Sequence, residues 1–214
     1  MNKIVSYSLW GNDEKYTVGA VKNAHLVQKM YPGWIGRFYC GQSVPEDIIN
    51  QLNSVENTDV IMMDENGNWE GMFWRFLAAD SDDLVISRDT DSRITQREVD
   101  AVNEWLESDY DFHIMRDHPW HGHHIMGGMW GSRNGILGGL SDWIEEYTKG
   151  DYWMVDQNFL RDVVYPKVKT LSMVHDEFFE RKPFPTKRTS REFVGQPFNS
   201  DDTECDTKHG DLVK

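Results

Sequence analysis

Short apolar stretches alternate with amphipathic segments over residues 1–90. The apolar stretches are rich in β-branched and aromatic residues, and they predict strands at 3–10, 34–40, 58–63 and 83–88. Between them, apolar positions at helical spacing predict helices at 14–30, 45–53 and 70–79. Strands and helices that alternate at short intervals are typical of a parallel sheet with right-handed crossovers. We therefore predict an α/β fold with a Rossmann-type, mostly parallel central sheet flanked by helices.

The second half of the chain has a less regular pattern. Thr95 and Glu98 have the spacing of a capping box, which predicts a helix that continues to about residue 107. We expect a strand at 110–116, followed by a His- and Gly-rich loop at 117–135. Two helices are expected at 136–148 and 156–164, and a further strand at 168–174. The chain then becomes polar, so we expect a single domain at 1–198 and a flexible tail at 199–214.

The charge and the cysteine content narrow the range of partners and compartments. A net charge of -14 argues against nucleic acid and anionic lipid as partners. Cys40 and Cys205 are too few for a disulfide framework, which indicates a reducing compartment. The sequence shows neither an apolar stretch typical of a signal peptide nor the run of about 18 apolar residues that a membrane span needs. We expect a cytoplasmic protein without a transmembrane segment.

Two carboxylates lie directly after the fourth predicted strand, at Asp89 and Asp91. In parallel α/β sheets, ligands bind beyond the carboxyl ends of the strands. Oxygen ligands of this kind suit Mn²⁺ or Mg²⁺, and the ion would keep positions open for phosphate oxygens. Arg88 and Arg93 flank the pair and are placed to neutralise charge or reach a phosphate. The alternative interpretation is a solvated turn with ordinary acidic residues.

The segment Arg88–Arg93 resembles the DxD motif of the GT-A glycosyltransferases, and the resemblance continues along the chain over residues 3–177. Further matches, in the order that these families show, are Phe73-Trp74-Arg75-Phe76, Gly127-Gly128-Met129-Trp130-Gly131, Asp156-Gln157-x-x-Leu160 and His175-Asp176. The order of the motifs carries the resemblance more than any single motif. Local sequences that resemble a virus- and bacteria-associated branch of these enzymes are RDTDSR, HIMRDHP and GGMWG.

The resemblance implies a GT-A-like fold and roles for individual residues. Asp89 and Asp91 would bind the metal, with His175 as a further ligand, although the sequence after His175 departs from the Lys-Pro-Trp type of one related group. Asp156 and Gln157 would lie near the transferred sugar. Donor binding would involve Tyr7, Ser8, Leu9, Arg75, Arg88, Asp89 and Gly128.

The expected activity is transfer of a sugar from a nucleotide-sugar to a hydroxyl of a carbohydrate acceptor in glycan synthesis. A UDP-sugar is the expected donor, because uracil is the common base in the resembling families. If the reaction inverts the anomeric centre, a carboxylate must deprotonate the acceptor hydroxyl. The candidates for that base are Asp117, Asp156 and Asp176. The sequence does not choose between inversion and retention.

Three other interpretations of the sequence remain open. A phosphohydrolase of the haloacid-dehalogenase type also places D-x-D after a buried strand, with the first aspartate as nucleophile. A non-catalytic carbohydrate- or nucleotide-binding module would use the same aromatic residues, Trp120 and Trp130 among them. A zinc site is the third, because histidines cluster at His118, His121, His123 and His124, but their spacing is not H-E-x-x-H, and contact with sugar hydroxyls is the favoured role.

Overall fold

A seven-stranded sheet runs through the computed structural model, which describes residues 1–81, 83–148 and 150–213. Its strand order is β3-β2-β1-β4-β6-β5-β7. Neighbouring strands pair in parallel, except that β6 runs antiparallel to β4 and β5. This arrangement confirms the predicted mostly parallel sheet. The strand bounds are β1 (Lys3–Leu9), β2 (Ile35–Cys40), β3 (Thr58–Met62), β4 (Leu84–Ser87), β5 (Phe112–Arg116), β6 (Trp130–Ser132) and β7 (Ser172–Asp176).

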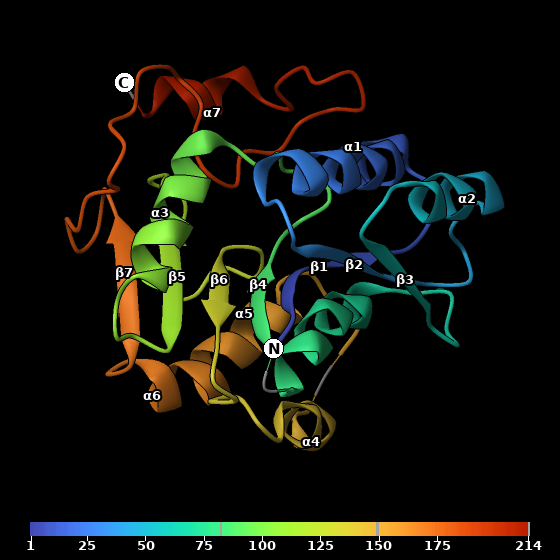
Figure 1. Cartoon of the computed structure of the whole chain (residues 1–214), viewed down its shortest axis with the longest axis horizontal. Helices are drawn as coiled ribbons and strands as arrows, with labels where there is room; N and C mark the ends of the chain where they lie inside the picture. Colours follow the sequence, from blue (N-terminus) through green and yellow to red (C-terminus); the bar gives the residue numbers. More distant parts are fainter. Residues whose placement is uncertain (82, 149, 214) are drawn as a thin grey trace.

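Helices cover both faces of this sheet. Figure 1 shows α1, α2 and α3 on one side of the sheet and α4, α5 and α6 on the other. None of the helices described here is long and apolar enough to cross a lipid bilayer. Their bounds are α1 (Glu14–Met30), α2 (Glu46–Ser54), the 3-10 helix η1 (Trp69–Asp80), α3 (Gln96–Leu106), α4 (Leu140–Glu146), α5 (Val155–Phe159), the π-helical turn η2 (Leu160–Val164), α6 (Tyr165–Val168) and α7 (Thr207–Asp211).

The alternation of side chains along β1 divides the hydrophobic core into two layers. Ile4 packs with residues of η1, α4 and α5, whereas Val5 and Tyr7 pack with residues of α1 and α2 on the opposite face. Successive strand residues point to opposite faces of a sheet, so this division follows from the sequence. The Tyr7 ring stacks on Phe38 at 4.6 Å between ring centroids, within the second layer.

The second half of the chain differs from the sequence prediction in two places. β6 has three residues and lies inside the expected loop 117–135, too short to give an alternating pattern. The last strand begins at Ser172, not at residue 168, because Tyr165–Val168 is helical with Pro166 in its first turn. Proline is well tolerated there, since the first turn of a helix has no partner for its N–H groups.

The polar C-terminal segment, described up to residue 213, contacts the helical face that carries α1. The Lys22 ammonium lies 2.6 Å from the Asp202 carboxylate, and Arg93 Nε lies 2.9 Å from the same residue. Figure 1 shows this segment running along α1 and α3 to α7. The division into a domain at 1–198 and a tail at 199–214 stays a prediction, and residue 214 lies outside the described residues.

Candidate active site

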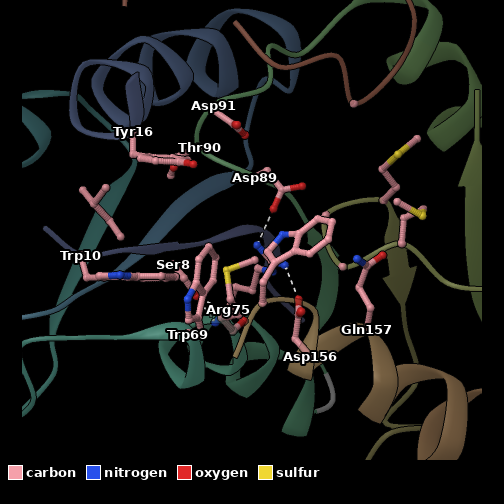
Figure 2. A pocket seen from close by; sticks show the side chains of 18 of the residues that line it. Ser8, Trp10, Tyr16, Trp69, Arg75, Asp89, Thr90, Asp91, Asp156 and Gln157 are labelled. Atoms are coloured by element: carbon pink, nitrogen blue, oxygen red, sulfur yellow. Dashed lines mark hydrogen bonds and ion pairs between the residues drawn. The ribbon is translucent and has the colours of Figure 1, made fainter. Parts of the chain in front are cut away.

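A pocket of about 450 Å³ opens beyond the carboxyl ends of β1 and β4. These strands pair in parallel from Lys3 opposite Leu84 to Ser6 opposite Ser87, so the segments that follow them emerge at the same edge of the sheet. Residues of both segments line the pocket, as do residues of η1, of the loop before β6 and of α5. Figure 2 shows Asp89, Asp91, Arg75 and Asp156 around this space. The predicted acidic pair therefore lies where ligands bind in such sheets.

The loop that carries the two aspartates is fixed from α1. The buried Asn23 amide donates to the carbonyl oxygens of Thr90 and Ser92, at 2.9 Å each. The carbonyl oxygen of Asp91 accepts a hydrogen bond from the Phe198 N–H at 2.8 Å. Because buried backbone groups need partners, these bonds select one conformation of the loop. Asp89 and Asp91 are thus presented by a loop that is held on both sides.

Arg75 links two acidic residues of the pocket. Its Nη1 atom lies 2.5 Å from Asp89 Oδ1, and its Nη2 atom lies 2.7 Å from Asp156 Oδ2. Its backbone N–H donates to Ser8 Oγ at 2.9 Å, which ties η1 to the end of β1. The Arg75 side chain is only 3% exposed, so its charge is screened weakly by water. Arg75 therefore positions both carboxylates, one from each side of the pocket.

Two glycines allow the loop before β6 to approach these charged groups. A Cβ atom on Gly127 would lie 2.4 Å from Arg75 Nη2 and 2.5 Å from Asp156 Oδ2. A Cβ atom on Gly128 would lie 2.1 Å from Asp89 Oδ2 and 2.9 Å from the Asp89 nitrogen. Real contacts are not this short, so only glycine fits at these positions without movement of the aspartates. Ser87 Oγ donates to the Gly127 carbonyl oxygen at 2.9 Å and fixes the loop.

The charge of the pocket is negative. Carboxylates line it at Asp13, Asp89, Asp91 and Asp156. His121 also lines it, but burial lowers the pKa of this imidazole to about 3, so it adds no positive charge at neutral pH. Burial and the nearby Asp89 charge raise the pKa of Asp91, although Lys15 at 2.8 Å opposes this effect. Such a pocket binds a diphosphate only with an added cation.

The residues that are present fit a hard divalent cation. Asp89 and Asp91 offer carboxylate oxygens, which Mg²⁺ and Mn²⁺ prefer. Burial and the Asp89 charge raise the pKa of Asp91, and a bound cation would favour its charged form. Within the described part of the chain, no group of three or more His, Cys, Asp or Glu side chains is arranged to hold a metal. The protein would therefore supply few ligands, and donor phosphate oxygens or water would complete the coordination.

Several residues predicted for donor binding lie where expected, and two do not. Ser8, Leu9, Arg75, Asp89 and Gly128 line the pocket, as do the predicted catalytic residues Asp156 and Gln157. Tyr7 is buried in the opposite core layer, because it precedes Ser8 and points to the other face of β1.

Arg88 also lies outside this pocket, in contrast to the prediction. It is buried, and its Nε atom lies 2.7 Å from Glu98 Oε1. Glu98 was expected to close a capping box with Thr95. Thr95 does cap α3, since its hydroxyl accepts the Glu98 N–H at 3.3 Å, but the Glu98 carboxylate binds Arg88 and the Tyr31 hydroxyl instead. A buried arginine needs a counter-charge, and Glu98 provides it.

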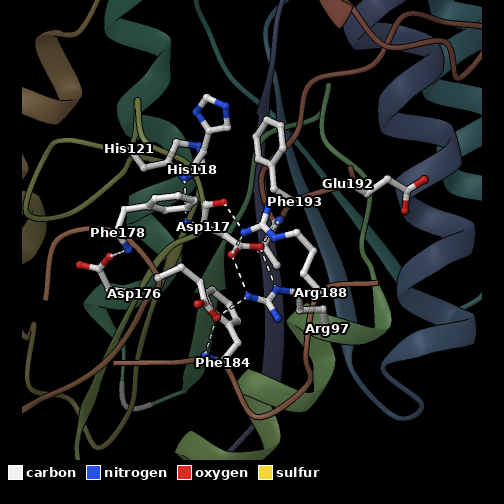
Figure 3. Close-up of polar contacts among 12 residues, drawn as sticks. Arg97, Asp117, His118, His121, Asp176, Phe178, Phe184, Arg188, Glu192 and Phe193 are labelled. Atoms are coloured by element: carbon white, nitrogen blue, oxygen red, sulfur yellow. Dashed lines mark hydrogen bonds and ion pairs between the residues drawn. The ribbon is translucent and has the colours of Figure 1, made fainter. Parts of the chain in front are cut away.

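The structure does not bring Asp117 to the pocket. Asp117 is completely buried, accepts hydrogen bonds from both Nε and Nη2 of Arg97, and lies 2.6 Å from Arg188 Nη2. Its Oδ2 atom also accepts the Val194 N–H at 2.9 Å. Figure 3 shows Asp117 between the two arginines. This carboxylate attaches the segment after β7 to the end of β5, and its lone pairs are already occupied.

Asp176 and His175 lie at the end of β7 and do not line the pocket either. Asp176 accepts the N–H groups of residues 178, 179 and 180 and pairs with Arg116 at 2.8 Å. His175 Nδ1 lies 2.7 Å from His113 Nε2, and His175 Nε2 lies 3.4 Å from Glu104 Oε2. Because β7 is the edge strand beyond β5, four positions from β1, these groups are separated from the aspartate pair. We therefore withdraw His175 as a metal ligand and Asp176 as a base.

The histidines of the loop 117–135 do not all gather at one place, although the rings of His118 and His121 lie 5.6 Å apart. His118 contacts the His209 carbonyl oxygen, and His124 stacks on Tyr165 at 4.2 Å. His121 is the member of this cluster that lines the pocket, and its ring also contacts Phe193 at 5.7 Å between ring centroids. No three of the described acidic, His or Cys side chains form a metal site, so the zinc interpretation receives no support.

The aromatic residues of the pocket differ from those that the sequence singled out. Trp130 is buried and stacks on Phe112, and Trp120 lies against His209 outside the pocket. The aromatic side chains that line the pocket are instead Trp10, Tyr16, Trp69 and Trp153. Of these, Trp10 carried a usable signal, since it follows the first strand at the edge where ligands bind.

Comparison with known proteins places the fold. No protein-family model and no curated protein matches the chain. Glucosyl-3-phosphoglycerate synthase from Mycobacterium tuberculosis in complex with UDP superposes with a TM-score of 0.53 at 13% identity, over 88% of this chain and 72% of that chain. The same enzyme with Mn²⁺, UDP-glucose and glycerol 3-phosphate gives a TM-score of 0.54 at 12% identity, over 87% and 73%. A structure described as a mycobacterial protein gives 0.55 at 14% identity, over 88% and 68%.

Similarity at this level of identity shows the fold. The mixed, mostly parallel seven-stranded sheet flanked by helices matches these structures and has the GT-A fold. The fold class predicted from the sequence is thereby confirmed. The activity of this chain must be argued from its own residues.

Proposed function

We propose that the chain is a metal-dependent glycosyltransferase that moves a sugar from a nucleotide-sugar to a hydroxyl of a carbohydrate acceptor. The observation that carries the proposal is the convergence of Asp89, Asp91, Arg75 and Asp156 in one pocket at the carboxyl ends of β1 and β4. A UDP-sugar is the proposed donor, since the structures of similar fold include complexes with UDP and UDP-glucose. The resemblance to a virus- and bacteria-associated branch stays a prediction.

In this proposal Asp89 and Asp91 hold Mn²⁺ or Mg²⁺. When bound, such an ion would neutralise the charge that develops on a departing nucleoside diphosphate. Arg75 fixes the Asp89 and Asp156 carboxylates in place, so the site is organised before the donor arrives. The negative pocket explains why Arg75 alone would be insufficient for an anionic donor.

Asp156 and Gln157 are the proposed contacts for the transferred sugar. Both line the pocket at the start of α5, on the side opposite the end of β1 (Figure 2). Burial raises the pKa of Asp156, although Arg75 opposes that effect. Since Asp117 and Asp176 lie elsewhere, Asp156 is the member of the predicted trio that remains as a candidate base. The anomeric configuration of the product distinguishes inversion from retention.

The test is a titration of UDP into the protein with and without Mn²⁺. We expect Mn²⁺ to tighten UDP binding roughly tenfold or more, and the Asp91→Asn variant to lose this gain while it stays folded. Asp64→Asn is the matched control, because Asp64 is exposed and does not line the pocket. A parent-like response of Asp91→Asn to Mn²⁺ would contradict the metal assignment.

Turnover separates the remaining alternatives. A glycosyltransferase releases UDP from the correct UDP-sugar only when an acceptor is present or, more slowly, by transfer to water. Hydrolysis of a simple phosphate ester without nucleotide-sugar binding would instead support the phosphohydrolase. Metal-independent binding of nucleotide or sugar without turnover would support the binding module.

A further inference from the structure

Two exposed indole rings lie at the mouth of the pocket. Trp153 is 67% exposed and Trp69 is 40% exposed, and both line the pocket. Tryptophan presents a large apolar face, which is unfavourable in water and is commonly kept exposed where a ligand covers it. These rings therefore indicate a ligand with a flat apolar face, such as the face of a pyranose.

The backbone holds both rings at this position. Asp151 Oδ1 accepts a hydrogen bond from the backbone N–H of Trp69 at 3.0 Å. This bond connects the segment before α5 to the start of η1. Met154, between Trp153 and α5, adopts a left-handed conformation with φ of 74°. A non-glycine residue in this conformation is strained, and strain of this kind gathers at binding sites. Trp153 and Asp156 are thus placed by the same turn.

The position of Trp153 favours the acceptor side over the nucleotide side. It precedes Asp156, the proposed sugar contact, by three residues, whereas Trp10 and Tyr16 lie by the end of β1 and the start of α1. Figure 2 shows Trp10 and Tyr16 on the side of the pocket away from Gln157. Trp10 and Tyr16 are therefore better placed to stack on the nucleotide base, and Trp153 is the ring left to stack on a sugar.

The charges of the pocket decide what kind of acceptor fits. Among the described lining residues, Arg75 is the cation, and it already contacts Asp89 and Asp156. Lys15, next to the pocket, is paired with Asp91. A phosphorylated or carboxylated acceptor would meet carboxylates without a free counter-charge, which is costly. Two structures of similar fold contain phosphoglyceric acid or glycerol 3-phosphate.

We propose that the acceptor is a neutral glycan whose terminal sugar stacks on Trp153, with Trp69 beside it. This inference rests on the proposed glycosyltransferase function and names the acceptor class for that same pocket. The sugar face would cover the exposed indole, while its hydroxyls would reach Asp156 and Gln157 at the pocket wall. The proposal assigns Trp153 a role in acceptor selection.

The experiment is a glycan array, probed with the full chain in the presence of UDP and Mn²⁺. The array carries neutral hexose and N-acetylhexosamine oligosaccharides beside phosphorylated and carboxylated sugars. Titration calorimetry then measures the strongest neutral oligosaccharide against the parent and against Trp153→Ala, Trp153→Phe and Trp120→Ala. Trp120 is the matched control, since it is 59% exposed but does not line the pocket.

We expect neutral oligosaccharides to bind, Trp153→Ala to weaken that binding about tenfold, and Trp153→Phe to retain most of it. Trp120→Ala and the affinity of Trp153→Ala for UDP with Mn²⁺ should stay as in the parent. Preference for phosphorylated or carboxylated sugars, absence of any neutral binder, or an unchanged affinity in Trp153→Ala would each overturn the inference. If the parent protein shows no Mn²⁺-dependent UDP binding, that result contradicts the proposed function itself and not the acceptor class.

Discussion

Asp91 combines burial with charged neighbours of both signs. Its side chain is 17% exposed and lies 2.8 Å from the Lys15 ammonium, while Asp89 follows the same strand two residues earlier. Burial and the Asp89 charge raise the pKa of Asp91. A protonated carboxyl is a poor metal ligand, so proton and metal compete for this residue.

The pH dependence of metal-assisted UDP binding follows from this competition. Because the pKa of Asp91 is raised, part of the protein carries the proton at a pH where an ordinary aspartate is ionised. We expect UDP affinity with Mn²⁺ to fall as the pH is lowered, starting at a higher pH than the ordinary pKa of an aspartate would give, and to recover on return. Calorimetric titration at several pH values checks this. UDP affinity without Mn²⁺ is the control, and a flat profile with Mn²⁺ would contradict the role of Asp91.

Gly128 offers a second test at the scale of one residue. An added methyl would meet Asp89 Oδ2 at 2.1 Å, so Asp89 would have to turn away from the pocket. We expect Gly128→Ala to lose metal-dependent UDP binding roughly tenfold or more. Gly122→Ala should bind as the parent does, because the atom closest to its new methyl is a Phe179 ring carbon at 3.9 Å. Equal binding by both variants would show that the loop before β6 adapts freely.

At the scale of elements, helix α1 contacts the loop that carries Asp89 and Asp91. Asn23 projects from α1 to the carbonyl oxygens of Thr90 and Ser92, and its side chain is buried. Through this amide, α1 holds the loop that follows β4. The predicted strand and helix were both correct, but no periodicity in the sequence connects Asn23 to residues so distant along the chain.

Removal of this amide tests the link. In Asn23→Ala the carbonyl oxygens of Thr90 and Ser92 lose one donor but keep Arg93 Nη1, at 3.3 and 2.8 Å. The lost hydrogen bonds should lower the free energy of unfolding by about 1 kcal/mol and weaken Mn²⁺-dependent UDP binding. Urea unfolding gives the first quantity and calorimetry the second. Asn103→Ala, at an exposed position of α3, should change stability little. An Asn23→Ala variant as stable as the parent would show that Arg93 and water satisfy these carbonyls without Asn23.

The strands that the sequence predicted well are those with a clear apolar pattern. β1 to β4 carry runs of β-branched and aromatic residues, and their observed bounds lie close to the predicted ones. β6 was missed because three residues give no period. It becomes a strand through its neighbours, since Trp130–Ser132 pairs with β4 on one side and β5 on the other.

At the scale of the whole molecule, the C-terminal segment contacts the face that bears α1 and the aspartate loop. Asp202 lies between Lys22 and Arg93, and the carbonyl oxygen of His209 contacts His118. Val213 is buried. The composition alone suggested a division at residue 198. These contacts connect the segment after residue 198 to the rest of the chain.

Truncation after residue 198 measures what these contacts contribute. The ion pairs of Asp202 are partly exposed and worth little each, but Val213 is also withdrawn from water. We expect the melting temperature to fall by about 2–4 °C. Asp202→Asn in the full chain separates the ion pairs from the remaining contacts. An unchanged melting temperature after truncation would support a dispensable, flexible tail.

The sequence by itself determined the alternation of strands and helices, and with it the mostly parallel sheet and the edge where Asp89 and Asp91 lie. Local periodicity and strand-end position need no knowledge of distant residues, so these features were readable. The resemblance to GT-A enzymes added Arg75, Asp156 and Gln157, which do line the pocket.

Only the tertiary structure decided which charged residues remain available for chemistry. Asp117, Arg88 and His175 have suitable chemical groups, but each is bound to a distant partner: Arg97, Glu98 and His113, respectively. A side chain that is buried and paired away from the pocket is lost to a ligand there, and such pairing joins residues from separate elements. The exposure of Trp153 at the pocket mouth was likewise decided by the packing of the chain, because burial is a property of the folded molecule.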